Sequence, residues 1–378
     1  MKNIMIAAAA AAVSASSAHA GGFERSATPL GFMFETGNYA ELSFGSVSPK
    51  VSGALKAAPS VTTGNVTKDY TTVGLAVKAD INAKLSMGVT LDPTFGADVL
   101  YDPSTNYPLR GSSAKLRGDT LALIAKYKIN DNVSVLGGLK SVGIGGDVSL
   151  STTTLPSAPG VPVNFYRASF EQTRDIGYVI GVAYEKPEIA LRVGLTYSSK
   201  TTHDIPVSGV VLTPGGPAAF SDRTTVELPK SLTLDFQTGV AADTLVFGSI
   251  RWVDWTSTKL IAPNAGTANP LVDYANDTIT YNIGVGRKFS DAFSGAVSIG
   301  YEKNHGAPTG NLGPTDGQLS LQVGGTYTHQ NMKITAGVRY IDIGNASALK
   351  ATSTSTTGNA RFAGNSAVAV GVRVGFSF

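Results

Sequence analysis

The chain contains no cysteine, which excludes disulfide bonds, thiol chemistry and zinc sites built on cysteine. Histidine is almost as scarce. After residue 20 it occurs only at His203, His305 and His329, and no motif around these residues marks a Ser-His-acid triad or a metal site. The sequence therefore predicts no enzyme, no metal and no cofactor.

Charge and long apolar runs are also sparse. Only 15% of the residues are charged, the formal net charge is +3, and no basic run is present, which argues against nucleic acid as a partner. After residue 20 no segment approaches the roughly eighteen consecutive apolar residues of a transmembrane helix. Long helical patterns are missing as well, so any membrane signal must lie in strand-like alternation.

Residues 1–20 have the features of a secretory signal peptide. Lys2 precedes an apolar stretch over Ile4–Val13, and Ala18-His19-Ala20 is a small-residue cleavage site. The alternative, a membrane-anchoring helix, needs a longer and less alanine-rich stretch. The mature chain is therefore expected to begin at Gly21 and to be exported.

The last twelve residues, Ala367–Phe378, alternate between large apolar and small or polar side chains. Strict alternation predicts a β-strand whose two faces meet different environments. We count fourteen such segments along the chain. Clear examples are Ile189–Tyr197, Ile279–Val285, Leu319–Tyr327 and Ile334–Tyr340.

The connections between these segments alternate in length. Short turns are expected at 80–82, 130–132, 186–188, 241–243, 290–292 and 329–331. Long loops are expected near 50–66, 93–113, 151–172, 201–223, 257–276, 304–316 and 345–364. This pattern is typical of an all-β, antiparallel, 14-stranded transmembrane β-barrel with lipid outside and the lumen inside. A soluble β-sandwich or β-solenoid is the alternative, but such folds do not sort their loops by length.

Four stretches carry a family resemblance: GNYAELSFGSVSPKVSG, KLSMGVTLDPTFGADVLY, LPKSLTLDFQTGV and DTLVFGSIRWVDWT. In this order they resemble the FadL-type outer-membrane transporters of long-chain fatty acids and aromatic hydrocarbons. The resemblance implies a short luminal hatch or plug over residues 21–38 and a barrel over residues 39–378. Gly37-Asn38-Tyr39-Ala40 stands where the family usually has Asn-Pro-Ala. A monomer in the outer membrane of a Gram-negative bacterium, with both termini periplasmic, is also implied.

The resemblance further implies an inward kink of the third strand that opens the wall sideways, at Pro93, Thr94, Phe95 and Gly96. The residue types agree, because Pro93 has no N–H to give a neighbouring strand and Gly96 can adopt the backbone angles of a bulge. The alternative is that residues 93–98 simply begin a long loop.

The implied function is passive uptake of a hydrophobic small molecule, which binds in the lumen and leaves through the wall gap into the membrane, past lipopolysaccharide. Candidate ligand-binding residues lie in or near the loops: Phe95, Leu100, Tyr101, Tyr107, Arg110, Phe165, Tyr166, Arg167 and Phe170. An arginine among them would suit a fatty acid carboxylate, whereas a neutral aromatic or alkane needs none. The terminal Phe376 and Phe378 resemble the signal read by barrel-assembly machinery.

A general aqueous diffusion porin is the alternative function, because the inward faces of the strands are largely polar. Against it, no loop carries a clear acidic cluster of the kind expected in a charged constriction.

Overall fold

The computed structural model describes residues 22–153, 160–266, 270–348 and 359–378. The predicted signal peptide, residues 1–20, lies outside this part of the chain, as do portions of three expected loops. Helical structure in the described ranges is limited to the 3-10 turns η1 (Gly31–Phe34), η2 (Pro187–Ile189) and η3 (Trp255–Ser257). No helix in these ranges is long and apolar enough to cross a bilayer.

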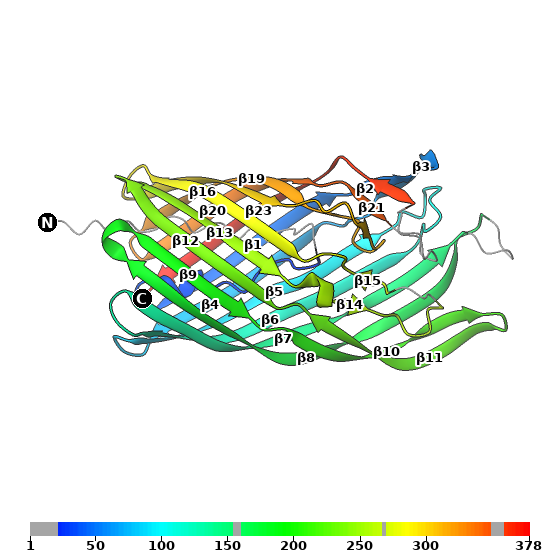
Figure 1. Cartoon of the computed structure of the whole chain (residues 1–378), viewed down its shortest axis with the longest axis horizontal. Coiled ribbons are helices and arrows are strands. Elements are labelled where there is room, and N and C mark those ends of the chain that lie inside the picture. Colours follow the sequence, from blue (N-terminus) through cyan, green and yellow to red (C-terminus); the bar gives the residue numbers. More distant parts are fainter. Residues whose placement is uncertain (1–21, 154–159, 267–269, 349–358) are drawn as a thin grey trace.

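Within the described ranges, fourteen antiparallel strands close into a barrel, which confirms the predicted fold (Figure 1). The ring runs β8-β7-β6-β5-β4-β1-β23-β20-β19-β17-β16-β13-β12-β9, and β9 pairs with β8 to close it. The strands are β1 (Tyr39–Lys50), β4 (Tyr70–Asp80), β5 (Leu85–Leu100), β6 (Ser113–Lys128), β7 (Val133–Thr152), β8 (Val163–Lys186), β9 (Leu191–Ser198), β12 (Ser231–Ala241), β13 (Thr244–Val253), β16 (Thr278–Lys288), β17 (Phe293–Glu302), β19 (Gln318–His329), β20 (Met332–Ile343) and β23 (Asn365–Ser377).

Short turns gather at the end of the barrel that also carries the C-terminus, which we call the turn end (Figure 1). Local hydrogen bonds explain two of these turns. The side-chain oxygen of Asn82 accepts from the backbone N–H groups of Lys84 and Leu85. Asn130 repeats the pattern with Asn132 and Val133. Such asparagine turns need few residues. The predicted positions of the six short connections are confirmed by the strand bounds, which leave residues 81–84, 129–132, 187–190, 242–243, 289–292 and 330–331 between successive strands.

The predicted two-faced strands are also present. Along β23, Ala367 and Ala369 are 1% and 0% exposed, whereas Val368 and Val370 are 43% and 45% exposed. The large apolar side chains therefore lie on the outer surface and the small ones face the interior. The same alternation occurs on β16, β19 and β20, so the barrel has the apolar outer surface that a bilayer requires.

At the opposite end, the loop end, several strands run further than the sequence predicted. The expected loop at 201–223 is largely a hairpin of β10 (Thr201–Thr213) and β11 (Gly216–Leu228), which projects beyond the ring (Figure 1). Instead of a loop at 151–172, β7 continues to Thr152 and β8 begins at Val163. The expected loop at 93–113 begins only after Leu100. These predicted loop boundaries were wrong because the strands continue to pair beyond the bilayer, where their side chains no longer alternate between apolar and polar.

Small sheets cover the loop end. β18 (Pro308–Thr309), β21 (Ala346–Ala348), β22 (Ala360–Phe362), β2 (Ser52–Leu55) and β3 (Ala58–Asn65) form one sheet. β14 (Lys259–Leu260) and β15 (Val272–Asp273) form another. These sheets and the connections around them cover the lumen from the loop side.

Candidate functional site

Residues 22–38, the luminal segment, lie inside the barrel. Phe34 is contacted from two strands: Lys126 Nζ of β6 and Arg192 Cζ of β9 lie 4.4 and 4.6 Å from its ring centroid. Glu35 pairs with Lys333 of β20. Contacts from such widely separated strands place the segment across the lumen.

Two further groups of contacts hold the luminal segment inside the barrel. Lys78 Nζ of β4 donates to the backbone carbonyls of Glu35 and Gly37, each at 2.7 Å. Near the other end, Arg251 Nη2 of β13 donates to Glu24 Oε1 at 2.6 Å. The Arg251 and Glu24 side chains are only 13% and 6% exposed, so this is a buried ion pair.

A window interrupts the barrel wall between β4 and β5. Their ladder extends only from the Asp80–Ser86 pair to the Leu75–Leu91 pair. Pairing resumes further toward the loop end, where Lys68 N–H donates to the Asp98 carbonyl at 3.1 Å. Residues 69–74 and 92–97 therefore face one another across the window without a ladder between them.

The window coincides with a bulge in β5. Its register with β6 shifts between Asp92 and Phe95, where Pro93 and Thr94 together oppose the single residue Asp119, so β5 contains one extra residue. Before the shift, even-numbered residues such as Ser86 and Thr90 are buried; after it, Phe95 and Val99 are. A one-residue slip exchanges the two faces of a strand, and here it turns two apolar side chains toward the lumen.

The luminal segment occupies part of the window. Arg25 N–H donates to the Thr94 carbonyl at 2.7 Å, and Gly96 N–H donates to the Phe23 carbonyl at 2.9 Å. Glu24 and Phe95 face one another in an isolated antiparallel bridge. The segment thus satisfies backbone groups of β5 at the place where β4 has separated from it.

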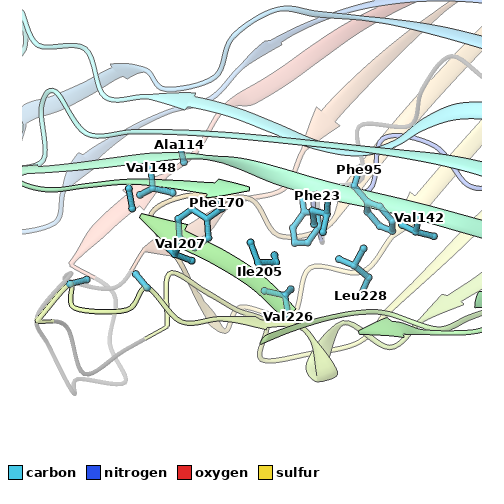
Figure 2. Close-up of a cluster of buried hydrophobic side chains, with 14 of the residues drawn as sticks. Phe23, Phe95, Ala114, Val142, Val148, Phe170, Ile205, Val207, Val226 and Leu228 are labelled. Carbon is cyan, nitrogen blue, oxygen red and sulfur yellow. The ribbon is translucent and has the colours of Figure 1, made fainter. Parts of the chain in front are cut away.

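Phe23 anchors this arrangement in an aromatic cluster. Its ring centroid lies 5.8 Å from Phe95, 5.2 Å from Trp255 and 6.2 Å from Tyr274. Burial raises the pKa of the Tyr274 phenol, so Tyr274 is neutral. Figure 2 shows Phe23 beside Phe95, with side chains of the β10–β11 hairpin pointing toward them. These residues belong to a larger apolar cluster in the loop half of the lumen.

An apolar cavity of about 190 Å³ lies within this cluster. Apolar side chains from the luminal segment, several barrel strands, the β10–β11 hairpin and the covering loops line the cavity, among them Phe23, Ile144, Phe170, Ile205, Val226 and Leu271. The cations along its wall are Arg25, Lys68 and Lys115. Lys115 Nζ lies 3.6 Å from a carboxylate oxygen of Asp98.

A groove lies on the wall at the window and adjoins the cavity. Ser46, Asp69, Thr71 and Arg117 line only the groove. Both spaces share the residues Arg25, Tyr70, Ala97, Asp98, Lys115 and Leu116. The cavity and the groove therefore meet at the window.

The turn half of the lumen is chemically different. Among its buried or half-buried inward side chains are Lys78, Lys126 and Arg373, and the luminal segment crosses it. A small cavity of about 40 Å³ at this end is lined mainly by polar residues, including Glu35, Lys288 and Lys333. An apolar molecule in the loop half thus has a charged, partly filled region on one side and the window on another.

The sequence-predicted ligand residues are distributed over several places. Phe170 lines the cavity, while Phe95, Phe165 and Tyr166 pack in the surrounding cluster. Tyr101 and Tyr107 stack on each other at 5.4 Å in a separate cluster under the small sheet, next to the half-buried Leu100. Arg110 donates to the Gly160 carbonyl, and Arg167 is exposed on β8. Neither of these two arginines lines the cavity.

Several cavity residues were not anticipated from the sequence. Ile205 and Val226 were placed in or near an expected loop, and Arg25 in a hatch without a stated role. A usable signal was the alternation of Ile205 with Val207 inside that expected loop. The Arg25 guanidinium also lies over the ring of Tyr70, and no local pattern could have predicted this contact, because it depends on the closed barrel.

The chain matches the family of outer membrane protein transport proteins (OMPP1/FadL/TodX) over residues 7–378. Its fold is similar to a FadL homologue of Pseudomonas aeruginosa, with TM-score 0.71, 15% identity and 92% of each chain covered. The toluene transporter TbuX of Ralstonia pickettii has TM-score 0.62 and 16% identity, with 92% of this chain and 90% of TbuX covered. TodX of Pseudomonas putida, also a toluene transporter, has TM-score 0.64 and 15% identity, with 92% and 91% covered.

No curated protein sequence matches the chain. The solved structures are too distant in sequence to transfer a ligand, and they support the fold alone. The family match covers nearly the whole chain and agrees with the fourteen-stranded barrel. The protein is therefore a member of the OMPP1/FadL/TodX family of outer-membrane transport proteins.

Proposed function

We propose that this protein takes up small hydrophobic molecules across the outer membrane, binding them in the apolar cavity and releasing them sideways through the window between β4 and β5. The observation that carries the proposal is the meeting of the cavity and the groove at the interrupted wall. Long-chain fatty acids and similar lipophilic compounds, including small aromatics, are the candidate ligands.

The cavity has the size and polarity for an apolar ligand. Its volume of about 190 Å³ exceeds the roughly 150 Å³ of an apolar protein cavity that binds benzene. Burying six methylene-sized groups contributes on the order of 5 kcal/mol. That corresponds to weak binding, on the order of 0.2 mM, which suits a carrier that must release its ligand. A longer alkyl chain would extend toward the groove.

Sideways release follows from what surrounds the cavity. Movement toward the turn end would take an apolar molecule past buried lysine and arginine side chains and the luminal segment. Movement through the window leads to the outer surface, where Val73, Leu75 and Leu91 are exposed. Because apolar surface favours an apolar medium, the membrane is the favoured destination.

The proposed transport route also assigns roles to the luminal segment, the two barrel ends and the C-terminus. The luminal segment acts as a hatch that blocks a straight aqueous path. The loop end faces the exterior and its lipopolysaccharide, and the turn end faces the periplasm, because short turns are periplasmic in bacterial barrels. Phe376 and Phe378, both exposed at the C-terminus, serve as the assembly signal. The protein acts as a monomer.

An uptake assay tests the proposal. Cells carrying the gene should accumulate radiolabelled toluene or oleate faster than otherwise identical deletion cells, and a plasmid copy should restore the difference. Equal accumulation of both compounds by the two strains would reject the function. In a planar bilayer the purified protein should give little steady conductance, whereas large open-channel currents would favour an aqueous porin.

A further inference from the structure

Arg25 and Tyr70 meet at the junction of the cavity and the groove. Arg25 belongs to the luminal segment and is bonded through its backbone to β5. Tyr70 is the first residue of β4. The Arg25 guanidinium carbon lies 4.0 Å from the centroid of the Tyr70 ring. The contact therefore joins the two sides of the window, and both side chains line both spaces.

The surroundings of Arg25 leave its side chain weakly held. No described group accepts a hydrogen bond from its Nε. Its neighbour Glu24 is fixed by the 2.6 Å ion pair with Arg251, so the segment stays docked when the Arg25 side chain moves. The Tyr70 ring face and the nearby Asp98 carboxylate attract the guanidinium. The ring contact itself is a modest interaction, and Asp98 can still attract the guanidinium after it leaves the ring.

We propose that the Arg25–Tyr70 contact is a latch that sets the rate at which ligand passes between the cavity and the wall groove. This inference rests on the proposed function. With the guanidinium over the ring, the two side chains obstruct the junction; with the guanidinium rotated away, the junction opens without any change in barrel pairing. Arg25 is thus a gating residue that affects rate more than affinity.

A substitution at Gly96 perturbs the latch independently of the two latch residues. A Cβ at Gly96 would lie 2.5 Å from the guanidinium carbon of Arg25, closer than real contacts allow. Gly96→Ala therefore displaces the Arg25 side chain while both latch residues remain in the sequence. The backbone bond from Gly96 N–H to the Phe23 carbonyl does not involve the added methyl group.

The test measures release and affinity separately in protein reconstituted into lipid nanodiscs. The neutral fluorophore N-phenyl-1-naphthylamine is the probe, and energy transfer from tryptophan reports its presence in the cavity. The chain has only two tryptophans, and Trp255 packs on Phe23, which lines the cavity. Adding probe-free acceptor vesicles and following the recovery of tryptophan emission gives the release rate, and a titration gives the dissociation constant.

Arg25→Ala, Tyr70→Leu and Gly96→Ala should each speed release by roughly two- to thirtyfold, the range that corresponds to one cation–π contact. Their dissociation constants should change much less. Tyr70→Phe keeps the ring face and should release the probe at the wild-type rate. Arg192→Ala is the matched control, because Arg192 makes the same kind of contact with Phe34 but does not line the cavity.

The outcomes separate the two proposals. Wild-type release rates in folded Tyr70→Leu and Gly96→Ala would overturn the latch, as would equal acceleration by Arg192→Ala. Heat-dependent migration on gels confirms that each variant is a folded barrel. If the wild-type protein itself neither binds nor releases the probe, the proposed function fails. If the wild type does both and the variants match it, only the latch is rejected.

Discussion

Glu24→Ala is expected to release the luminal segment from the window while the barrel stays folded. Removing one partner of a buried ion pair costs about 3–5 kcal/mol, because the remaining charge is left without compensation. Arg251 keeps a second bond, from Nη1 to Thr233 Oγ1 at 2.9 Å, so we expect the lower end of this range. About 1.4 kcal/mol is tenfold in an equilibrium constant, and the undocked population should therefore rise roughly a hundredfold.

Hydrogen exchange measures this change directly, because local opening exposes individual amides. The reporters are the amides of Arg25 and Gly96, which bond the Thr94 and Phe23 carbonyls. Both should exchange about a hundred times faster in Glu24→Ala, while Val372 in β23 keeps its wild-type rate. Adding Arg251→Leu should restore part of the protection by removing the uncompensated charge. Unchanged exchange at Arg25 and Gly96 would show that the Glu24–Arg251 pair does not hold the segment in the window, and parallel acceleration at Val372 would show that the whole barrel is destabilised instead.

Three further changes test other parts of the structure. Val372→Lys places a charge on the outer face, where Val372 is 41% exposed. A lysine near the bilayer midplane should lower the stability of the folded barrel by about 2–4 kcal/mol. The folded fraction on gels should therefore be smaller for Val372→Lys than for Val372→Leu. Val226→Asp puts a carboxylate in the cavity and should weaken N-phenyl-1-naphthylamine binding in a titration, whereas Val161→Asp, in an exposed loop, should not. Gly88→Ala brings a Cβ within 2.5 Å of Met33 Sδ. This overpacking should destabilise the docked segment by about 1–3 kcal/mol and make residues 22–38 more sensitive to protease. Gly137→Ala, whose Cβ meets nothing within 4 Å, should leave the protease sensitivity unchanged.

The barrel itself was predictable because lipid imposes a strict pattern. Each strand inside the bilayer must present apolar side chains outward at every second position, as Val368, Val370 and Val372 do. Short turns were predictable for a related reason: residues such as Asn82 and Asn130 encode them locally through their side chains. Sequence alone therefore supported the number of strands and the order of the connections.

The lack of a lipid environment at the loop end explains the wrong loop boundaries. Residues 201–228 form the β10–β11 hairpin beyond the ring, where no lipid requires an apolar outer face. Its exposed residues include Ser208, Asp222 and Arg223, and the segment contains Pro206. Polar side chains and proline are typical of loops, so regular backbone pairing was not visible in the sequence.

The candidate site was only partly accessible to sequence reasoning. Pro93 and Gly96 indicated a break in the third strand, but only the register shift against β6 shows which side chains it turns inward. The cavity is assembled from residues as distant as Phe23, Ile144 and Leu271. Such a set has no spacing rule, since the closure of the barrel decides which inward faces meet.

Filling the groove with Thr71→Trp tests sideways release most directly. Thr71 is exposed and lines the groove but not the cavity. Leu121→Trp, at another outward position, is the control. Because each variant adds a tryptophan, the probe is followed by its own emission. We expect Thr71→Trp to bind N-phenyl-1-naphthylamine with wild-type affinity but to transfer it to the surrounding membrane much more slowly, while Leu121→Trp is normal in both. Transfer at the wild-type rate by folded Thr71→Trp would rule out release through the window.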